Sequence, residues 1–222
     1  MLRKETVERT TFELLKTLMK DEKLKQFNLV GGTALALYMG HRKSIDIDLF
    51  SHQTFDIANL EKHLNTTYGF INSYPENDSK LVLIGKINNI KVDFVFNDSL
   101  QVKLVNSYES IRIASINDIA AMKLKAILQN GTRLKDFLDV AFLSKEMSLK
   151  KMLDTFDLKY PGTNKILATK ALTYFNDIDF TPTITLTKGT FHWEKIEKRL
   201  NEMVLNINKI FYHYPIDIDS GP

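Results

Sequence analysis

The sequence predicts an α/β fold of the α+β kind, in which a small mixed sheet is followed by a helical C-terminal lobe. Between residues 27 and 114, short apolar runs with strand character alternate with stretches of helical spacing. After residue 115 the apolar side chains keep helical spacing over most of the chain. We therefore expect a sheet-bearing core over residues 1–110 and a helical lobe over residues 111–222.

The spacing of apolar residues predicts the outer elements of the core. Residues 6–26 and 55–68 carry apolar side chains three or four positions apart, which is typical of amphipathic helices. Strands are expected at residues 70–74, 80–87 and 90–96. Asn88 and Asn89 predict a tight turn between the last two strands, because asparagine tolerates positive φ.

We expect the core to be organised around residues 28–50, NLVGGTALALYMGHRKSIDIDLF. A strand at residues 27–30 leads into Gly31 and Gly32, which turn the backbone into a helix over residues 33–39. A second strand follows at residues 45–50. Side chains alternate along a strand, so Asp46 and Asp48 share one face. The opposite, apolar face is then formed by Ile45, Ile47 and Leu49.

This stretch combines a metal-binding pattern with a phosphate-binding pattern. Two neighbouring carboxylates on a half-buried strand repel each other unless a cation lies between them, and such hard oxygen ligands favour Mg²⁺. A Gly-Gly turn at a helix N-terminus offers backbone N–H groups and the positive end of the helix dipole to a phosphate. Together the two patterns indicate transfer of a nucleotidyl or phosphoryl group.

Asp93 is a third candidate carboxylate, within the strand at residues 90–96. Val92, Phe94 and Phe96 point to one face of that strand, and Asp93 points to the other. A carboxylate in an apolar strand needs a partner, because its burial alone is expensive. Either Asp93 faces water from an edge strand, or it lies beside Asp46 and Asp48 and completes a metal site.

The C-terminal lobe is predicted to be helical. Ser115 has the character of an N-cap for a helix that ends near Gly131, and a second helix is expected over residues 133–145. Further helices are expected over residues 149–158, 165–175 and 191–210, and residues 183–187 form either a short strand or an extended loop. Trp193, the only tryptophan, is expected to serve packing.

Composition excludes several classes of site. The chain has 222 residues, 44% of them hydrophobic, a net charge of +3 and no cysteine, which rules out disulfides and cysteine-based metal sites or nucleophiles. No apolar run approaches the ~20 residues that span a bilayer, and the first residues lack the apolar core of a signal peptide. We therefore expect a cytoplasmic protein without a membrane partner. The mild positive charge suits a nucleotide or RNA but does not require one.

Two motifs resemble those of the AbiEii/AbiGii-type nucleotidyltransferases, which belong to the DNA polymerase-β-like superfamily. They are Gly-Gly-Thr-Ala-Leu-Ala-Leu at residues 31–37 and His-Arg-x-Ser-x-Asp-Ile-Asp-Leu-Phe at residues 41–50. Many members of that family are toxins of bacterial toxin–antitoxin or abortive-infection pairs. The resemblance implies an enzyme that moves a nucleoside monophosphate from an NTP to an acceptor hydroxyl and releases pyrophosphate. It points to tRNA as the acceptor and to a cognate antitoxin as a partner.

The same resemblance assigns roles to individual residues. Two Mg²⁺ ions would be held by Asp46, Asp48 and Asp93, and the phosphates would be gripped by Gly31, Gly32 and Thr33. Lys123 or Arg42 would neutralise the charge that develops in the transition state. The remaining nucleotide-binding residues would be Ser44, Lys135, Asp136 and Asp139, with the helical lobe closing the cleft.

Several alternatives remain open at this point. Lysine and aspartate on amphipathic helices usually form a solvated face with local ion pairs, and such a face without a catalytic role is the alternative for Lys123, Lys135, Asp136 and Asp139. His41 either touches a phosphate or base, or lies exposed in a loop. Two other functions fit the motifs: a small-molecule nucleotidyltransferase of the aminoglycoside-modifying kind, and a non-catalytic nucleotide-binding module that keeps the fold.

The tripeptide Asp-Ile-Asp is weak by itself, because it occurs three times. Besides the pair at Asp46 and Asp48, it occurs at residues 177–179 and 217–219. The second copy lies beside Pro182 in an expected loop, and the third lies in the terminal tail. Only the first copy follows a Gly-Gly turn and a helix, so we expect the other two to be solvated.

Overall fold

The computed structural model describes residues 1–74 and 81–218. Lys80, the first residue of the strand expected at residues 80–87, and Asp219, the last residue of the third Asp-Ile-Asp, lie outside the described residues. The chain divides into two compact units, which are described separately. Unit 1 comprises Met1–Tyr38, Ser44–Ser99 and Leu104–Ala114, and unit 2 comprises Met39–Lys43, Leu100–Lys103 and Ser115–Pro222. The fold is mixed α/β, as the sequence predicts.

Unit 1 is built on a seven-stranded mixed sheet with the order β3-β4-β5-β2-β1-β7-β6. Its strands are β1 (Asn28–Val30), β2 (Ile47–Ser51), β3 (Ile71–Asn72), β4 (Val82–Ile87), β5 (Ile90–Phe96), β6 (Asn106–Tyr108) and β7 (Ile111–Ile113). β2 runs antiparallel to β1 and parallel to β5, so the strand of the first Asp-Ile-Asp lies in the middle of the sheet.

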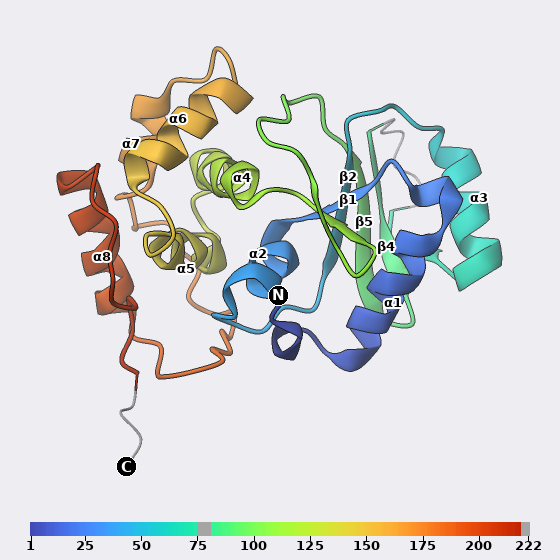
Figure 1. Ribbon diagram of the computed structural model, residues 1–222, viewed down its shortest axis with the longest axis horizontal. Coiled ribbons are helices and arrows are strands. Elements are labelled where there is room, and N and C mark those ends of the chain that lie inside the picture. Colours follow the sequence, from blue (N-terminus) through green and yellow to red (C-terminus); the bar gives the residue numbers. More distant parts are fainter. Residues whose placement is uncertain (75–80, 219–222) are drawn as a thin grey trace. The chain divides into compact units, whose positions relative to one another are not determined.

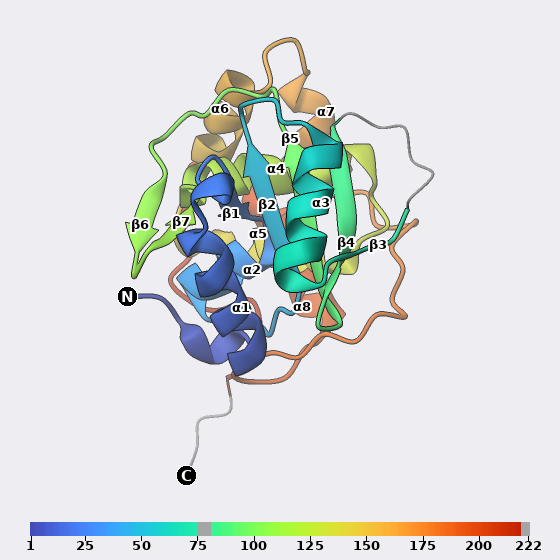
Figure 2. The same ribbon diagram turned by 90° about the vertical axis from the view of Figure 1, so that its right-hand side faces the viewer.

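Helices cover both faces of this sheet. α1 (Arg9–Lys20) and α3 (Ile57–Tyr68) lie on one face, and α2 (Gly31–Met39) lies on the other (Figures 1 and 2). On the α1 and α3 side, Phe27 makes edge-to-face contacts with Phe55 and Phe94 at ring-centroid distances of 5.0 and 5.1 Å. Phe94 therefore faces α3, and its neighbour Asp93 points to the face that carries α2.

Unit 2 is mainly helical, as predicted. Its helices are α4 (Ile116–Gln129), α5 (Leu134–Leu143), α6 (Leu149–Lys159), α7 (Lys165–Ala171) and α8 (Trp193–Leu205). The predicted cap is confirmed, because the Ser115 side chain accepts a hydrogen bond from the Asp118 amide. The packing role of Trp193 is confirmed too, since its ring contacts those of Phe137, Phe175 and Phe180.

Several expected boundaries are wrong in an informative way. Ile45 is 57% exposed rather than on the apolar face of a strand, because β2 begins only at Ile47. The single helix expected over residues 6–26 is divided into the 3₁₀ turn η1 (Lys4–Thr6), α1 and the 3₁₀ turn η2 (Glu22–Leu24). β6 was not expected, since its three residues are polar. The predicted Asn88-Asn89 hairpin turn is confirmed, with φ values of 50° and 64°.

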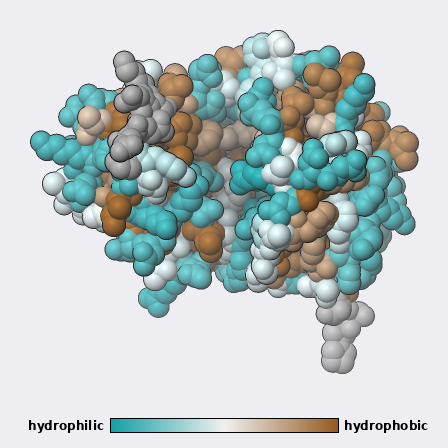
Figure 3. Space-filling view, turned by 180° about the vertical axis from the view of Figure 1, so that it is seen from behind, coloured by the Kyte–Doolittle hydropathy of each residue, from teal (hydrophilic) through white to brown (hydrophobic). Residues whose placement is uncertain are grey.

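The surface drawn in Figure 3 mixes hydrophilic and hydrophobic residues. Over the described part of the chain, no helix has both the length and the apolar character that crossing a bilayer requires.

Candidate functional site

The structure brings two of the three candidate carboxylates together on neighbouring strands of unit 1. Asp48 on β2 and Asp93 on β5 are direct partners in the parallel register. β5 is an interior strand and Asp93 is only 8% exposed, so the alternative of a water-facing edge position is wrong. The two side chains therefore share the face of the sheet that carries α2.

Asp46 immediately precedes β2 and is tied to the start of α2. The Thr33 hydroxyl donates a hydrogen bond to the Asp46 carbonyl, and it lies 2.9 Å from Ser44 Oγ. Thr33 is buried, whereas Asp46 and Ser44 are half-buried. Two of the predicted nucleotide-binding hydroxyls thus hold the Ser44–Asp46 segment against the helix, and their contact with a phosphate stays a prediction.

Gly31 places the N-terminus of α2 directly against the Asp48 carboxylate. Its φ of +71° is in the left-handed region, and a Cβ at this position would overlap Asp48 Oδ2 and lie 3.1 Å from Asp48 Cγ. Only glycine combines that conformation with such a close approach. The positive end of the helix dipole therefore lies at the carboxylate, where it favours negative charge. Gly32 follows as the second residue of the helix.

Lys91 provides a cation at this face, paired with Asp93. Lys91 Nζ lies 2.6 Å from Asp93 Oδ2. Burial raises the pKa of Asp93, the Lys91 ammonium lowers it and the charge of Asp46 raises it, and the net shift is upward. The pKa of Lys91 is raised despite desolvation, because it interacts with Asp93 and, at longer range, with Asp48 and Asp46.

The donor chemistry of this face suits a divalent cation, although no ready-made metal cluster is present. Within residues 1–74 and 81–218, no group of three or more carboxylate or imidazole side chains is gathered tightly enough to hold a metal. However, Asp93 Oδ1 is buried and has no hydrogen-bond partner in the part of the chain that the structure describes. An orphaned carboxylate oxygen beside a second carboxylate is the arrangement that a hard cation would complete.

The other predicted site residues form a second, buried cluster in unit 2, around Asp139 on α5. Asp139 Oδ1 accepts hydrogen bonds from His41 Nε2 at 2.8 Å and from Arg42 Nε at 2.7 Å. Asp139 Oδ2 accepts one from Arg42 Nη2 at 2.9 Å and lies 2.7 Å from Lys123 Nζ. Lys123 also reaches Asp136 Oδ1 at 2.6 Å.

The burial of this cluster settles two of the open alternatives. Lys123, Asp136 and Asp139 do not form a solvated helix face, and His41 is not an exposed loop residue, because all four are buried. Lys135, on the same helix, is half-buried and forms no ion pair within the described residues. A phosphate contact of Arg42 or Lys123 stays a prediction, and it would have to replace a carboxylate partner inside the protein.

The electrostatics of the cluster favour a charged Asp139 and a neutral His41. Burial alone would raise the pKa of Asp139, but Arg42, Lys123 and His41 hold it well below its ordinary value. Burial lowers the pKa of His41, and it outweighs the opposing effect of Asp139. A neutral imidazole with its proton on Nε2 donates to Asp139, which leaves His41 Nδ1 without a partner.

Two features of these sites were missed by sequence reasoning. Lys91 stands two residues before Asp93, so the strand period places both on one face, and that signal was available. The pairing of His41 and Arg42 with Asp139 joins residues almost one hundred positions apart, and no local pattern predicts it.

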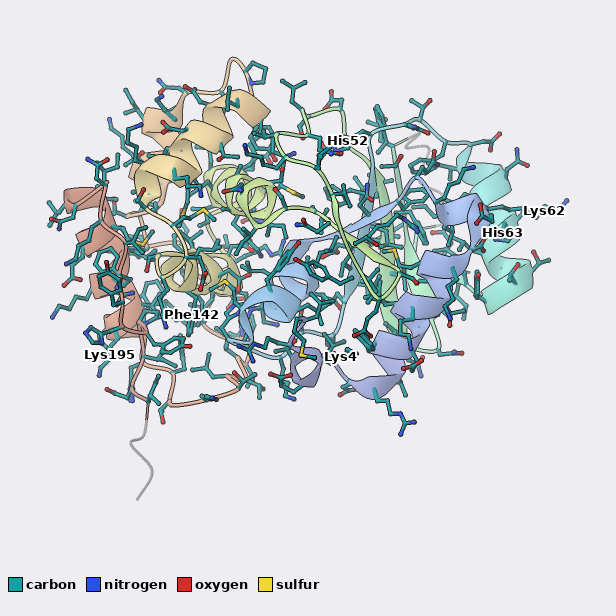
Figure 4. The ribbon with its side chains drawn as sticks, viewed as in Figure 1. Lys4, His52, Lys62, His63, Phe142 and Lys195 are labelled. Atoms are coloured by element: carbon teal, nitrogen blue, oxygen red, sulfur yellow. The ribbon has the colours of Figure 1, made fainter. Side chains whose placement is uncertain are left out.

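One surface pocket lies away from the carboxylates. Its volume is about 450 Å³, and it is lined by Phe55, Leu60, Lys62 and His63 with Lys23 and Gln26 among others. Figure 4 shows Lys62 and His63 on α3. α3 covers the face of the sheet opposite to that of Asp93, so this pocket is not part of the candidate site.

Comparisons with known proteins identify the family and a similar fold. The family described as "Nucleotidyl transferase AbiEii toxin, Type IV TA system" matches residues 13–209. An uncharacterized protein of Aquifex aeolicus is 30% identical over 182 residues, which cover 78% of this chain and 83% of the relative. The crystal structure of JHP933 from Helicobacter pylori is similar with a TM-score of 0.50 and 21% identity, over 90% of this chain and 93% of that one. The crystal structure of a second H. pylori protein, described as a "putative nucleotidyltransferase", is similar with a TM-score of 0.51 and 20% identity, over 90% of this chain and 95% of that one. These two structures bear on the fold alone.

Proposed function

The chain belongs to the AbiEii family of nucleotidyltransferase toxins of type IV toxin–antitoxin systems, and from this we propose that it transfers a nucleoside monophosphate from an NTP to an acceptor hydroxyl. Pyrophosphate would be the second product. The acceptor that we propose is the 3′ end of a tRNA, and modification there would arrest translation. A cognate antitoxin would restrain the enzyme.

The observation that carries the proposal is the pairing of Asp48 with Asp93 across the β2–β5 register. Asp46 stands two residues from Asp48, and its charge acts on Asp93. The orphaned Asp93 Oδ1 supports a cation at this face. We therefore propose Asp46, Asp48 and Asp93 as the ligands of Mg²⁺. When bound, the metal would activate the acceptor hydroxyl and offset charge on the triphosphate.

The protein's own residues would supply orientation and further electrostatic stabilisation. The N-terminal turn of α2, which begins at Gly31 and Gly32, would direct backbone N–H groups at a phosphate. The hydrogen bond from the Thr33 hydroxyl to the Asp46 carbonyl would hold the Asp46 backbone in position beside this turn. The catalytic gain would come mainly from holding the triphosphate and the acceptor in line, since phosphoryl chemistry needs little covalent participation by the protein.

The test is incorporation of label from each of the four α-³²P-labelled NTPs into total tRNA in the presence of Mg²⁺. Asp46→Ala/Asp48→Ala should abolish incorporation. Asp177→Ala/Asp179→Ala is the matched control, because it removes the same tripeptide from an exposed position. This control should label tRNA as the parent does.

The outcomes separate the parts of the proposal. Label with one NTP that depends on Asp46 and Asp48 would support a tRNA nucleotidyltransferase and identify its base. Label that survives the loss of both carboxylates would refute the proposed site. An absence of label with every NTP would refute tRNA as the acceptor, and the assay would then be repeated with small-molecule hydroxyl acceptors.

A further inference from the structure

We propose that Lys91 is a built-in counter-ion of Asp93, which holds this carboxylate in the metal-free protein and gives way when a divalent cation binds. This inference rests on the proposed function, because it takes Asp46, Asp48 and Asp93 as the metal ligands. It adds a positioning residue whose effect is on the affinity for metal.

The geometry places the ammonium at the carboxylates. Lys91 and Asp93 are two residues apart on β5, so their side chains leave the same face of the sheet. Lys91 Nζ lies 2.6 Å from Asp93 Oδ2, and the Lys91 side chain is 44% exposed whereas that of Asp93 is 12% exposed. The lysine therefore reaches from solvent to a buried carboxylate, which would otherwise be expensive to keep charged.

The Asp93 carboxylate leaves one of its oxygens for a divalent cation. Lys91 pairs with Asp93, and the charges of Asp46 and Asp48 also act on the Lys91 ammonium. Lys91 occupies only Oδ2 of Asp93, while Oδ1 has no partner. A metal that approaches Oδ1 meets the ammonium on the same carboxylate, and repulsion between the two cations favours release of Lys91.

The neighbouring strand explains why the ammonium turns toward the carboxylates. Lys86 on β4 is directly opposite Lys91 in the antiparallel register. Like charges in such positions repel each other. Lys91 therefore lies between the cation of Lys86 on β4 and the carboxylates on β5 and β2. Its ammonium is repelled by Lys86 and attracted by the carboxylates, so it turns toward the carboxylates. Lys86 is exposed and carries the same charge on the same face, so it provides a matched control.

The test is a titration of the metal-free protein with Mn²⁺. Binding is measured by calorimetry and by the loss of the electron paramagnetic resonance signal of the free ion. Lys91→Met should bind Mn²⁺ roughly tenfold more tightly than the parent, since removal of one nearby unit charge changes a divalent ion's affinity by about that factor. Lys86→Met should stay within about twofold of the parent. Lys91→Arg keeps the charge, so it should bind as weakly as the parent.

A second readout follows the metal-free state. Without metal, Lys91→Met should unfold at a lower temperature than the parent, because the mostly buried Asp93 then loses its counter-ion, and saturating Mn²⁺ should remove the difference. Equal Mn²⁺ affinity in Lys91→Met, Lys86→Met and the parent would overturn the inference, as would weaker binding by Lys91→Met.

Asp46→Ala/Asp48→Ala separates this failure from failure of the proposed function. If that variant binds Mn²⁺ as the parent does, the carboxylates are not the ligands and both proposals fall. If it loses binding while Lys91→Met matches the parent, only the role of Lys91 is overturned.

Discussion

Asp139→Asn should destabilise unit 2 by about 3–5 kcal/mol, although it changes almost nothing in volume. Asp139 is fully buried on α5, and both of its oxygens are used. The substitution keeps the shape of the side chain and removes its charge. Any large loss of stability would therefore be electrostatic rather than a consequence of a cavity.

The magnitude follows from the groups that Asp139 serves. Every contact that the structure gives its oxygens comes from a donor: His41, Arg42 on both oxygens, and Lys123. An asparagine would turn its NH₂ group toward one of these donors. Lys123 keeps Asp136 as a partner, but Arg42 would lose the carboxylate that accepts both its Nε and Nη2 hydrogen bonds. Breaking a buried pair by removal of one partner typically costs about 3–5 kcal/mol, against a total stability of about 5–15 kcal/mol.

The assay is urea unfolding followed by the fluorescence of Trp193, the only tryptophan, which packs against Phe137 on α5. Asp154→Asn is the control, because Asp154 forms an exposed ion pair with Lys150 at 2.6 Å. That change should cost less than about 0.5 kcal/mol. A loss of less than about 1 kcal/mol in Asp139→Asn would refute the view that this cluster stabilises the fold.

Two further predictions concern the backbone at the carboxylates and the response to pH. Gly31→Ala should abolish metal-dependent turnover, because the added Cβ would displace Asp48. Gly69 has a similar φ of +68° but open space around it, so Gly69→Ala should lose only about 1 kcal/mol of stability and keep turnover. Equal turnover in both variants would contradict the proposed site. His41 has a folded-state pKa below 6.5, so the unfolded chain takes up the proton more readily and the free energy of unfolding should fall as the pH drops below about 6.5. His41→Gln should remove that part of the slope, measured by urea unfolding at about pH 5 and about pH 7.5, and an unchanged slope would refute a buried neutral histidine.

Local patterns predicted most of the strands and helices, because alternation and helical spacing report which face is buried. β5 was predicted with its observed limits, since Ile90, Val92 and Phe94 alternate with the polar residues Lys91 and Asp93. β6 could not be predicted, as its three residues owe their strand conformation to pairing with β7. Ile45 was misplaced because the alternation of apolar and polar residues starts at Ile45, whereas the strand begins only at Ile47.

The candidate site likewise has a part that the sequence predicts and a part that depends on distant contacts. The neighbouring positions of Asp48 and Asp93 follow from two strands and their parallel pairing, and the resemblance to a known family indicated that pairing before the structure did. The fate of Arg42 and Lys123 depended on Asp139, which is ninety-seven positions from Arg42. Sequence spacing on α5 predicts that Asp136 and Asp139 share a face, but not that this face is buried.

The two groups of charges differ in how easily they can rearrange, and this difference bears on where chemistry can occur. Around Asp139 the partners are buried, and both carboxylate oxygens are satisfied, so a ligand could enter only at the cost of a strong internal pair. The pair between Lys91 and Asp93 is half-exposed and leaves Asp93 Oδ1 unsatisfied. The Lys91 side chain is 44% exposed, so its ammonium can move into water when a divalent cation takes its place at Asp93. We therefore propose the β2–β5 carboxylates as the place of the metal-dependent step and the Asp139 cluster as a stabilising element of unit 2.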